Sequence, residues 1–187
     1  MTASGIALFD TAIGRCGIAW TSEQQQDQAA RVRVRAVALP EVTADRTLRR
    51  LNPGGAAAES PPPPHIADIS RRIAALMQGQ PDDLRDVAVN LEALPQFCQE
   101  VLEVTRGIDP GRTLSYGAIA AALGVPGAAR AVGRALGSNP CPIIVPCHRV
   151  LASDGSMHGF SAAGGIATKR RMLQLEGAIP LDEPTLF

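Results

Sequence analysis

The sequence predicts an α/β N-terminal domain followed by a mostly α-helical C-terminal domain. Apolar and alternating runs typical of β-strands occur early in the chain, ahead of stretches with helical spacing. From Pro95 onward, helical spacing and helix-ending residues dominate instead. We therefore expect one domain over residues 1–92 and a second over residues 93–187, with the boundary near Leu91–Pro95.

Three strands are predicted in the first forty residues and one more near the boundary. Gly5–Phe9 and Cys16–Thr21 are short apolar runs on either side of a turn over Asp10–Arg15. Residues 31–37 alternate between Arg and Val, which is typical of a strand with one face in water. Val87–Leu91 is expected to form a further strand.

Helical patterns surround a proline-rich loop in the N-terminal domain. Thr43–Leu51 has helical composition and stops at Asn52. Residues 53–64 are rich in Gly, Ala and Pro, and proline lacks the N–H that helices and sheets need, so this stretch is predicted as a loop. An amphipathic helix to about Gln78 should follow, because apolar residues recur at Ile66, Ile69, Ile73 and Leu76.

The C-terminal domain contains a pair of short predicted helices. A helix after Pro95 is expected to end at Gly107–Gly111, and Ser115 can then cap a helix over Tyr116–Leu123. A second helix, Ala128–Leu136, follows after a glycine-containing turn. This pair is a candidate helix-turn-helix for binding DNA, although short helix pairs also occur as ordinary core elements.

Composition and charge narrow the class of protein. The 187 residues are 45% hydrophobic, and no apolar run approaches the roughly 18 residues of a membrane span, so we expect a cytoplasmic protein with no membrane partner. Four scattered cysteines without a CxxC pair predict free thiols. Residues 110–175 carry 7 basic and 1 acidic side chains, a net charge of +6, which indicates an anionic partner or a solvated arginine face.

A cysteine beside a histidine is the candidate chemical centre. The apolar run Ile143–Val145 leads into Pro146, Cys147 and His148, so this loop should be buried. A thiol must lose its proton to act as a nucleophile, and His148 and Arg149 can supply a base and a positive field. A buried structural cysteine next to an exposed histidine is the alternative interpretation.

The context of Cys147 resembles the O6-alkylguanine-DNA alkyltransferase family. The stretches 129–140 and 145–150 carry the resemblance, supported by Gly159-Phe160-Ser161 and Leu175-Glu176-Gly177 downstream. It covers residues 95–178 in detail and the N-terminal part loosely. It implies an RNase H-like N-terminal domain and irreversible transfer of an alkyl group from O6-alkylguanine, and O4-alkylthymine, in double-stranded DNA to one cysteine.

The resemblance also implies roles for residues at the chemical centre. Cys147 would accept the alkyl group, His148 would act as its base through a water molecule, and Glu176 would orient His148. Asn139 would brace the turn before the cysteine loop. Tyr116 would donate a hydrogen bond to guanine N3. Each molecule would react once, as a monomer able to assemble cooperatively on DNA, without a cofactor.

DNA contacts and a base pocket follow from the same resemblance. Arg130 would enter the base stack in place of a guanine that has rotated out of the duplex. The DNA-contacting set is Ser115, Tyr116, Arg130, Ala131 and Arg134. The pocket set is Leu136, Pro142, Cys147, Val150, Phe160 and Ser161, with Ser161 donating to guanine O6.

Two departures and three alternatives accompany this interpretation. The family commonly has Tyr where this chain has Phe160, and the loop over residues 162–166 varies in length, which affects the alignment of Glu176. The zinc ligands of some members have no full match, so no metal is expected.

Three other classes of protein are alternatives to this interpretation. A lesion-sensing protein would lack Cys147, and a cysteine hydrolase would normally have its His distant in sequence. A transcription regulator would need a further domain.

Overall fold

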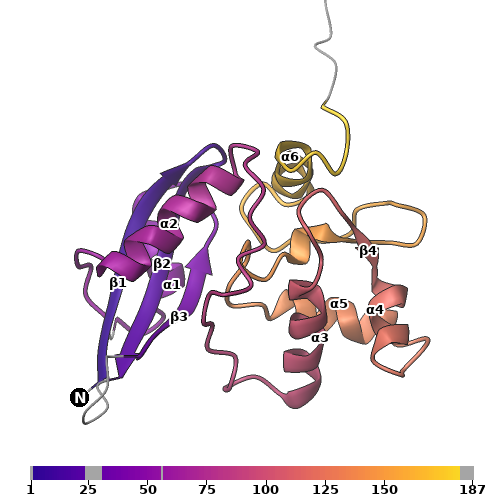
Figure 1. The fold of residues 1–187 in the computed structure, drawn as a ribbon, viewed down its shortest axis with the longest axis horizontal. Coiled ribbons are helices and arrows are strands. Elements are labelled where there is room, and N and C mark those ends of the chain that lie inside the picture. The colour runs from indigo at the N-terminus through magenta and orange to yellow at the C-terminus, as the bar shows by residue number, and fades with distance from the viewer. Residues whose placement is uncertain (1, 24–30, 56, 182–187) are drawn as a thin grey trace, which may run out of the picture.

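The computed structural model describes residues 2–23, 31–55 and 57–181, and begins with a three-stranded antiparallel sheet. The strands are β1 (Thr2–Thr11), β2 (Gly14–Glu23) and β3 (Arg31–Ala38), in the order β1-β2-β3 (Figure 1). Pairing of β1 with β2 continues to Thr11 and Gly14. The predicted strands are therefore too short and the predicted Asp10–Arg15 turn too long, because the Thr11 hydroxyl closes a tight turn by donating to the Gly14 carbonyl at 2.7 Å.

Two helices cover opposite faces of this sheet. Helix α1 (Ala44–Leu51) is capped by Thr43, whose hydroxyl accepts from the Arg46 amide at 3.3 Å. It packs through Leu51 against Ala19 of β2. Helix α2 (Pro64–Leu76) begins where the proline-rich loop ends, and its predicted apolar residues are all buried in the main core with Ile18 of β2. Since Ile18 and Ala19 point to opposite faces, the sheet lies between the two helices.

The predicted strand over Val87–Leu91 is reduced to one parallel bridge. Val34 of β3 donates to the Ala88 carbonyl at 2.8 Å and accepts from the Asn90 amide at 2.9 Å. Turns on both sides end the pairing, because the Val87 amide bonds to the Leu84 carbonyl and the Leu94 amide to the Leu91 carbonyl. The segment follows the edge of β3 without forming a regular strand.

The C-terminal part is helical, as predicted. Helix α3 covers Gln96–Arg106, and the two short helices are α4 (Tyr116–Ala122) and α5 (Ala129–Gly137), within one residue of the predicted bounds. The sequence patterns do not predict the parallel pair of β4 (Leu114–Ser115) with β5 (Val150–Leu151), since two residues carry no periodicity. Helix α6, Ile166–Leu175, is the last helix of the described residues.

One hydrophobic core joins the N-terminal and C-terminal parts. Buried side chains of β2 and α2 belong to the same cluster as Val101 of α3, Val132 of α5 and Ile144 of the cysteine loop. A backbone hydrogen bond of 2.9 Å from the Val37 amide to the Pro140 carbonyl ties β3 to the loop after α5. The division at residues 92 and 93 stays a prediction. No helix in the described part of the chain is both long and apolar enough to cross a bilayer.

Candidate active site

The loop between α5 and Cys147 is held by the side chain of Asn139. Its amide nitrogen donates to the Val145 carbonyl at 2.8 Å, and its amide oxygen accepts from the Cys141 amide at 3.0 Å. Within the loop, buried Ile143 has a φ of 76°, a conformation that a β-branched residue rarely adopts. Asn139 thus braces this turn, which fixes the backbone that leads to the candidate nucleophile.

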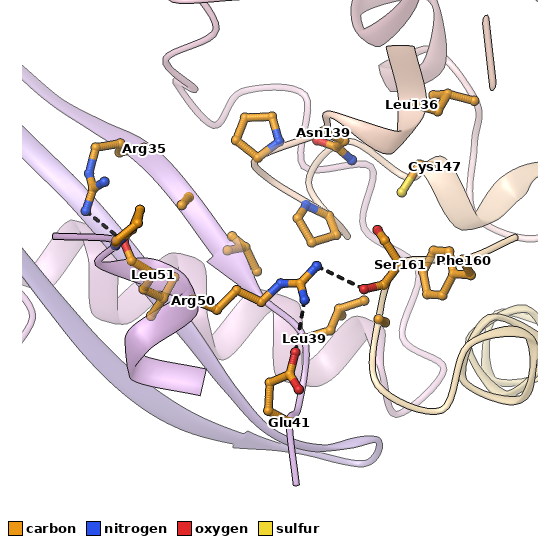
Figure 2. A pocket seen from close by; sticks show the side chains of 16 residues that line it. Arg35, Leu39, Glu41, Arg50, Leu51, Leu136, Asn139, Cys147, Phe160 and Ser161 are labelled. Atoms are coloured by element: carbon orange, nitrogen blue, oxygen red, sulfur yellow. Dashed lines mark hydrogen bonds and ion pairs between the residues drawn. The ribbon is translucent and has the colours of Figure 1, made fainter. Parts of the chain in front are cut away.

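The thiol of Cys147 lies between two cavities. Cys147 begins a short 3-10 helix, Cys147–Arg149, and is only partly exposed. One cavity of about 290 Å³ extends from the thiol toward the N-terminal part (Figure 2). Another of about 400 Å³ extends toward Tyr116 and Lys169. Both are lined by Leu136, Cys147, Phe160 and Ser161, so groups on either side can reach the sulfur.

Behind the thiol lies a buried histidine, glutamate and arginine. Nε2 of His148 is 3.0 Å from Oε1 of Glu176. Arg149 donates to both Glu176 oxygens at 2.8 Å and to the Ile108 carbonyl at 2.5 Å. Burial alone would raise the pKa of Glu176, but hydrogen bonds from Arg149 and His148 lower it to about 2. Glu176 is therefore an ionised partner that fixes the His148 ring.

His148 is poised to exchange a proton on its other side. Burial lowers the pKa of His148, against the opposing effect of Glu176, so the ring is neutral near pH 7. Its Nδ1 is buried and has no hydrogen-bond partner in the described residues. Since Nε2 faces Glu176, Nδ1 is the nitrogen able to take part in proton transfer.

The positive charge that acts on the thiol comes from Lys169 rather than Arg149. Burial raises the pKa of Cys147, while the Asn139 hydrogen bond and the charge of Lys169 lower it. Lys169 is 1% exposed, donates to the Val150 carbonyl at 2.6 Å and lies 5.9 Å from the centroid of the Tyr116 ring. Arg149 does not supply the predicted field, because Glu176 occupies its guanidinium.

Replacing Lys169 should make the thiol less reactive. In Lys169→Met, loss of the charge is expected to slow the reaction of Cys147 with iodoacetamide at pH 7 by about 3- to 10-fold. The rate–pH profile of Cys147 should move to higher pH, while Lys169→Arg, which keeps the charge, should move it less. Rates can be followed by mass mapping of the Cys147 peptide. Identical profiles for wild type and Lys169→Met would show that the charge of Lys169 does not affect the reactivity of Cys147.

The predicted DNA-contacting residues lie on α4 and α5. Arg130 and Arg134 are exposed on α5, and Ala131 is partly buried between them. Ser115 caps α4, as predicted, by accepting from the Ala118 amide at 3.0 Å. Tyr116 borders the larger thiol cavity, and its hydroxyl donates to the His158 carbonyl at 3.4 Å. Burial raises the pKa of Tyr116, so its hydroxyl keeps its proton near pH 7.

The predicted pocket residues do not all face the cavities. Pro142 lines the smaller cavity, and Leu136, Phe160 and Ser161 line both. Val150 is fully buried and lines neither cavity, and its carbonyl accepts from Lys169. The described residues contain no group of three or more His, Cys, Asp or Glu side chains able to hold a metal ion.

The sequence interpretation missed the contribution of the N-terminal part. Arg35, Glu41 and Arg50 line the smaller thiol cavity, and Arg50 donates to the Ser161 carbonyl at 2.9 Å (Figure 2). No local signal marks these residues, because each is an ordinary charged side chain until the fold brings it to the site.

Comparisons with known proteins agree with this geometry. The family model described as 6-O-methylguanine DNA methyltransferase, DNA binding domain, matches residues 96–178. The methylated-DNA–protein-cysteine methyltransferase of Mycobacterium tuberculosis strain H37Rv is 47% identical over 102 residues, which cover 54% of this chain and 60% of that protein. The protein of the same name from Salmonella typhimurium is 48% identical over 85 residues, covering 46% and 48%. The aligned stretch thus spans less than two thirds of these relatives.

Solved structures match over nearly the whole chain. The crystal structure of Mycobacterium tuberculosis O6-methylguanine methyltransferase superposes with a TM-score of 0.70 and 31% identity over 96% of each chain. The structure of Mycobacterium tuberculosis OGT in complex with DNA gives a TM-score of 0.67 and 31% identity over 93% of each chain. From these matches and the family model, the chain belongs to the O6-methylguanine-DNA methyltransferase family.

Proposed function

We propose that this protein repairs DNA by moving an alkyl group from O6 of guanine onto Sγ of Cys147. The observation that carries the proposal is the position of the thiol, which borders two cavities and adjoins the buried His148–Glu176 pair. A cysteine sealed in the core would have no access to a base. Relatives of this chain are named methylated-DNA–protein-cysteine methyltransferases, which fits a cysteine as the acceptor.

The proposed reaction is a displacement at the alkyl carbon. Nδ1 of His148 takes the thiol proton through a water molecule, and Glu176 stabilises the imidazolium that forms. The sulfur then forms a bond to the alkyl carbon while the bond from that carbon to O6 breaks. The electron pair stays on the guanine, where hydrogen bonds from Tyr116 to N3 and from Ser161 to O6 stabilise the developing charge. The guanine then takes up a proton from solvent, and the His148 imidazolium releases one. The thioether is stable, so each molecule reacts once.

Access to O6 requires the base to leave the duplex. Helices α4 and α5 form a helix-turn-helix that places α5 in a groove of the duplex, where Arg134, Ser115 and Ala131 contact the DNA. Arg130 takes the place of the rotated guanine in the stack. Exposure of Arg130 and Arg134 on the same helix supports this arrangement. Unstacking costs a few kcal/mol, and a poorly paired alkylguanine lowers that cost.

Finer parts of the proposal follow from the site and the family. Leu136, Pro142 and Phe160 form the apolar walls of the base pocket, and O4-alkylthymine is a second substrate. Phe160 keeps an aromatic wall without a hydroxyl, so it affects the range of substrates rather than the reaction. The N-terminal part adopts the RNase H-like arrangement. The protein works as a cytoplasmic monomer that can load cooperatively on DNA.

Mass spectrometry of the intact protein tests the proposed function. After incubation with a duplex that contains O6-methylguanine, the chain should gain one methyl group in place of hydrogen, mapped to Cys147. The yield should stop at one methyl group per molecule. A hydrolase would instead turn over repeatedly with no lasting change in mass, and this result would refute the proposal.

Replacing Arg130 should separate base rotation from chemistry. In Arg130→Ala, repair of duplex DNA is expected to slow by about 10- to 100-fold, because the vacated stack is no longer filled. Repair of the same lesion in single-stranded DNA should change much less, since little unstacking is needed. Arg134→Ala is the matched control on α5. It should weaken duplex binding without producing this difference in repair rate between duplex and single-stranded DNA. Equal losses on both substrates for Arg130→Ala would contradict the role.

A further inference from the structure

An arginine of the N-terminal part reaches into the active site. Arg50, near the end of α1, extends into the smaller thiol cavity, and Figure 2 shows its guanidinium between Glu41 and Ser161. It donates to the Ser161 carbonyl at 2.9 Å and to Oε1 of Glu41 at 3.0 Å. One side chain therefore connects two segments that lie more than a hundred residues apart in sequence.

Glu41 anchors this arginine. The Glu41 side chain is only 11% exposed, whereas the Arg50 side chain is 48% exposed. The Glu41 backbone is held as well, because its amide donates to the Thr47 hydroxyl at 3.2 Å. A carboxylate fixed in this way restricts the guanidinium, so that the remaining donors point at the Ser161 carbonyl.

Ser161 belongs to the β5–α6 loop, residues 152–165, which covers the thiol. The neighbouring Phe160 lines both cavities beside Cys147. Other hydrogen bonds secure this loop at positions away from Ser161, such as Thr168 to the Ala163 carbonyl at 2.6 Å and Tyr116 to the His158 carbonyl at 3.4 Å. Among the described residues, Arg50 donates the hydrogen bond that connects the N-terminal part to this loop.

We propose that Arg50, held by Glu41, is a positioning residue that keeps residues 160–162 closed over Cys147 and thereby favours small alkyl groups. The selectivity for small groups rests on the proposed transfer function. The hydrogen bond from Arg50 to the Ser161 carbonyl, called the tether below, fixes the Ser161 peptide and with it the adjacent Phe160 side chain, which forms a wall of the cavity. In a direct displacement, sulfur, carbon and leaving oxygen must be nearly in line, so a methyl group depends on closely placed walls to hold it. A larger group fills the cavity by itself.

Removal of the tether should therefore change both the access of reagents to Cys147 and the selectivity between methyl and larger alkyl groups. In Arg50→Ala, the loop loses a hydrogen bond from a charged donor at a half-exposed site. We expect Cys147 to react about 3- to 10-fold faster with a bulky maleimide, because residues 160–162 open more often. Transfer from O6-methylguanine in duplex DNA should slow by a similar factor, while transfer from O6-benzylguanine in the same duplex should slow less or not at all.

The experiment compares Arg50→Ala with Arg49→Ala, each in the 187-residue chain. Arg49 precedes Arg50 on α1, is 78% exposed and pairs with Asp45 within the helix at 2.7 Å. Arg49→Ala should leave both readouts at wild-type values, and Arg50→Lys should restore part of the wild-type pattern. Modification is measured by mass mapping of the Cys147 peptide, and transfer by single-turnover rates on the two lesions.

Two outcomes separate this inference from the proposed function. If the wild-type protein transfers neither alkyl group, the proposed function fails, together with the selectivity, and the maleimide rates still test the tether. If Arg50→Ala matches Arg49→Ala in maleimide rate, or loses transfer equally for methyl and benzyl groups, the positioning role is wrong. A simple loss of folding would lower both transfer rates alike and would appear as a reduced melting temperature.

Discussion

A Cys147→Ser variant is expected to bind alkylated duplex DNA and to transfer no measurable alkyl group. The serine hydroxyl is far less acidic than a thiol, and His148 cannot generate enough alkoxide in its place. The rate should fall by more than about 10⁴-fold, as occurs when an activated nucleophile is removed. Intact mass after prolonged incubation with an O6-methylguanine duplex measures the transfer, and fluorescence anisotropy measures the binding.

Cys141 provides the control for this variant. Cys141 is fully buried close to the same loop, and burial raises its pKa to about 12, so it should not replace Cys147. A Cys141→Ser variant is expected to keep transferring the methyl group. Methyl transfer to any residue in Cys147→Ser would show that the acceptor has been wrongly assigned.

Replacement of Glu176 should have the largest effect on stability. In Glu176→Ala, Arg149 and His148 remain buried, at 1% and 0% exposure, without their carboxylate. Removing one partner of a buried ion pair typically costs about 3–5 kcal/mol in the free energy of unfolding. For a chain of this size the melting temperature should fall by roughly 6–20 °C. Alkyl transfer should also slow, since the His148 ring loses its orientation.

Glu103→Ala is the matched control for Glu176→Ala. Glu103 pairs with Arg106 at 3.5 Å while its side chain is 60% exposed, so its loss should cost less than about 1 kcal/mol. Melting curves of both variants and the wild type make the comparison. Similar small losses for both variants would mean that the buried group does not stabilise the fold.

The same buried group predicts sensitivity to acid. The pKa of Glu176 is lowered from its ordinary 4.5 to about 2, so its stabilising effect is complete above pH 4.5 and is lost as the pH falls toward 2. The pKa of His148 is lowered from its ordinary 6.5, so the unfolded chain binds this proton more readily and stability also decreases below pH 6.5. Urea unfolding at a series of pH values should show both losses of stability. In Glu176→Gln the loss below pH 4.5 should disappear.

Local patterns in the sequence predict the helices well. A capping Ser115 and glycines at the helix ends are short-range signals, and they place α4 and α5 within one residue. The resemblance of the cysteine stretch places Asn139, Cys147 and Glu176 around one site. These residues lie within a continuous part of the chain, 96–178, that the family model also matches.

Long-range contacts account for what the sequence does not predict. Lys169 resembles a surface cation of an amphipathic helix, and only packing against β5 brings its charge to the thiol. Arg50 depends on the docking of α1 against the loop before α6. Val87–Leu91 has the composition of a strand, yet neighbouring turns limit it to one bridge. For Lys169 and Arg50 the deciding partner lies far away in the sequence.

The shared core between the N-terminal and C-terminal parts has a consequence for how the molecule denatures. Side chains of α2, α3 and α5 belong to one buried cluster, so neither part can lose its packing without exposing apolar surface of the other. Heating should then produce a single endotherm whose calorimetric and van't Hoff enthalpies agree. A substitution such as Ile69→Ala, at a buried position that lines neither thiol cavity, would reduce the amount of folded protein at elevated temperature while leaving the proposed rate constant of each intact molecule unchanged.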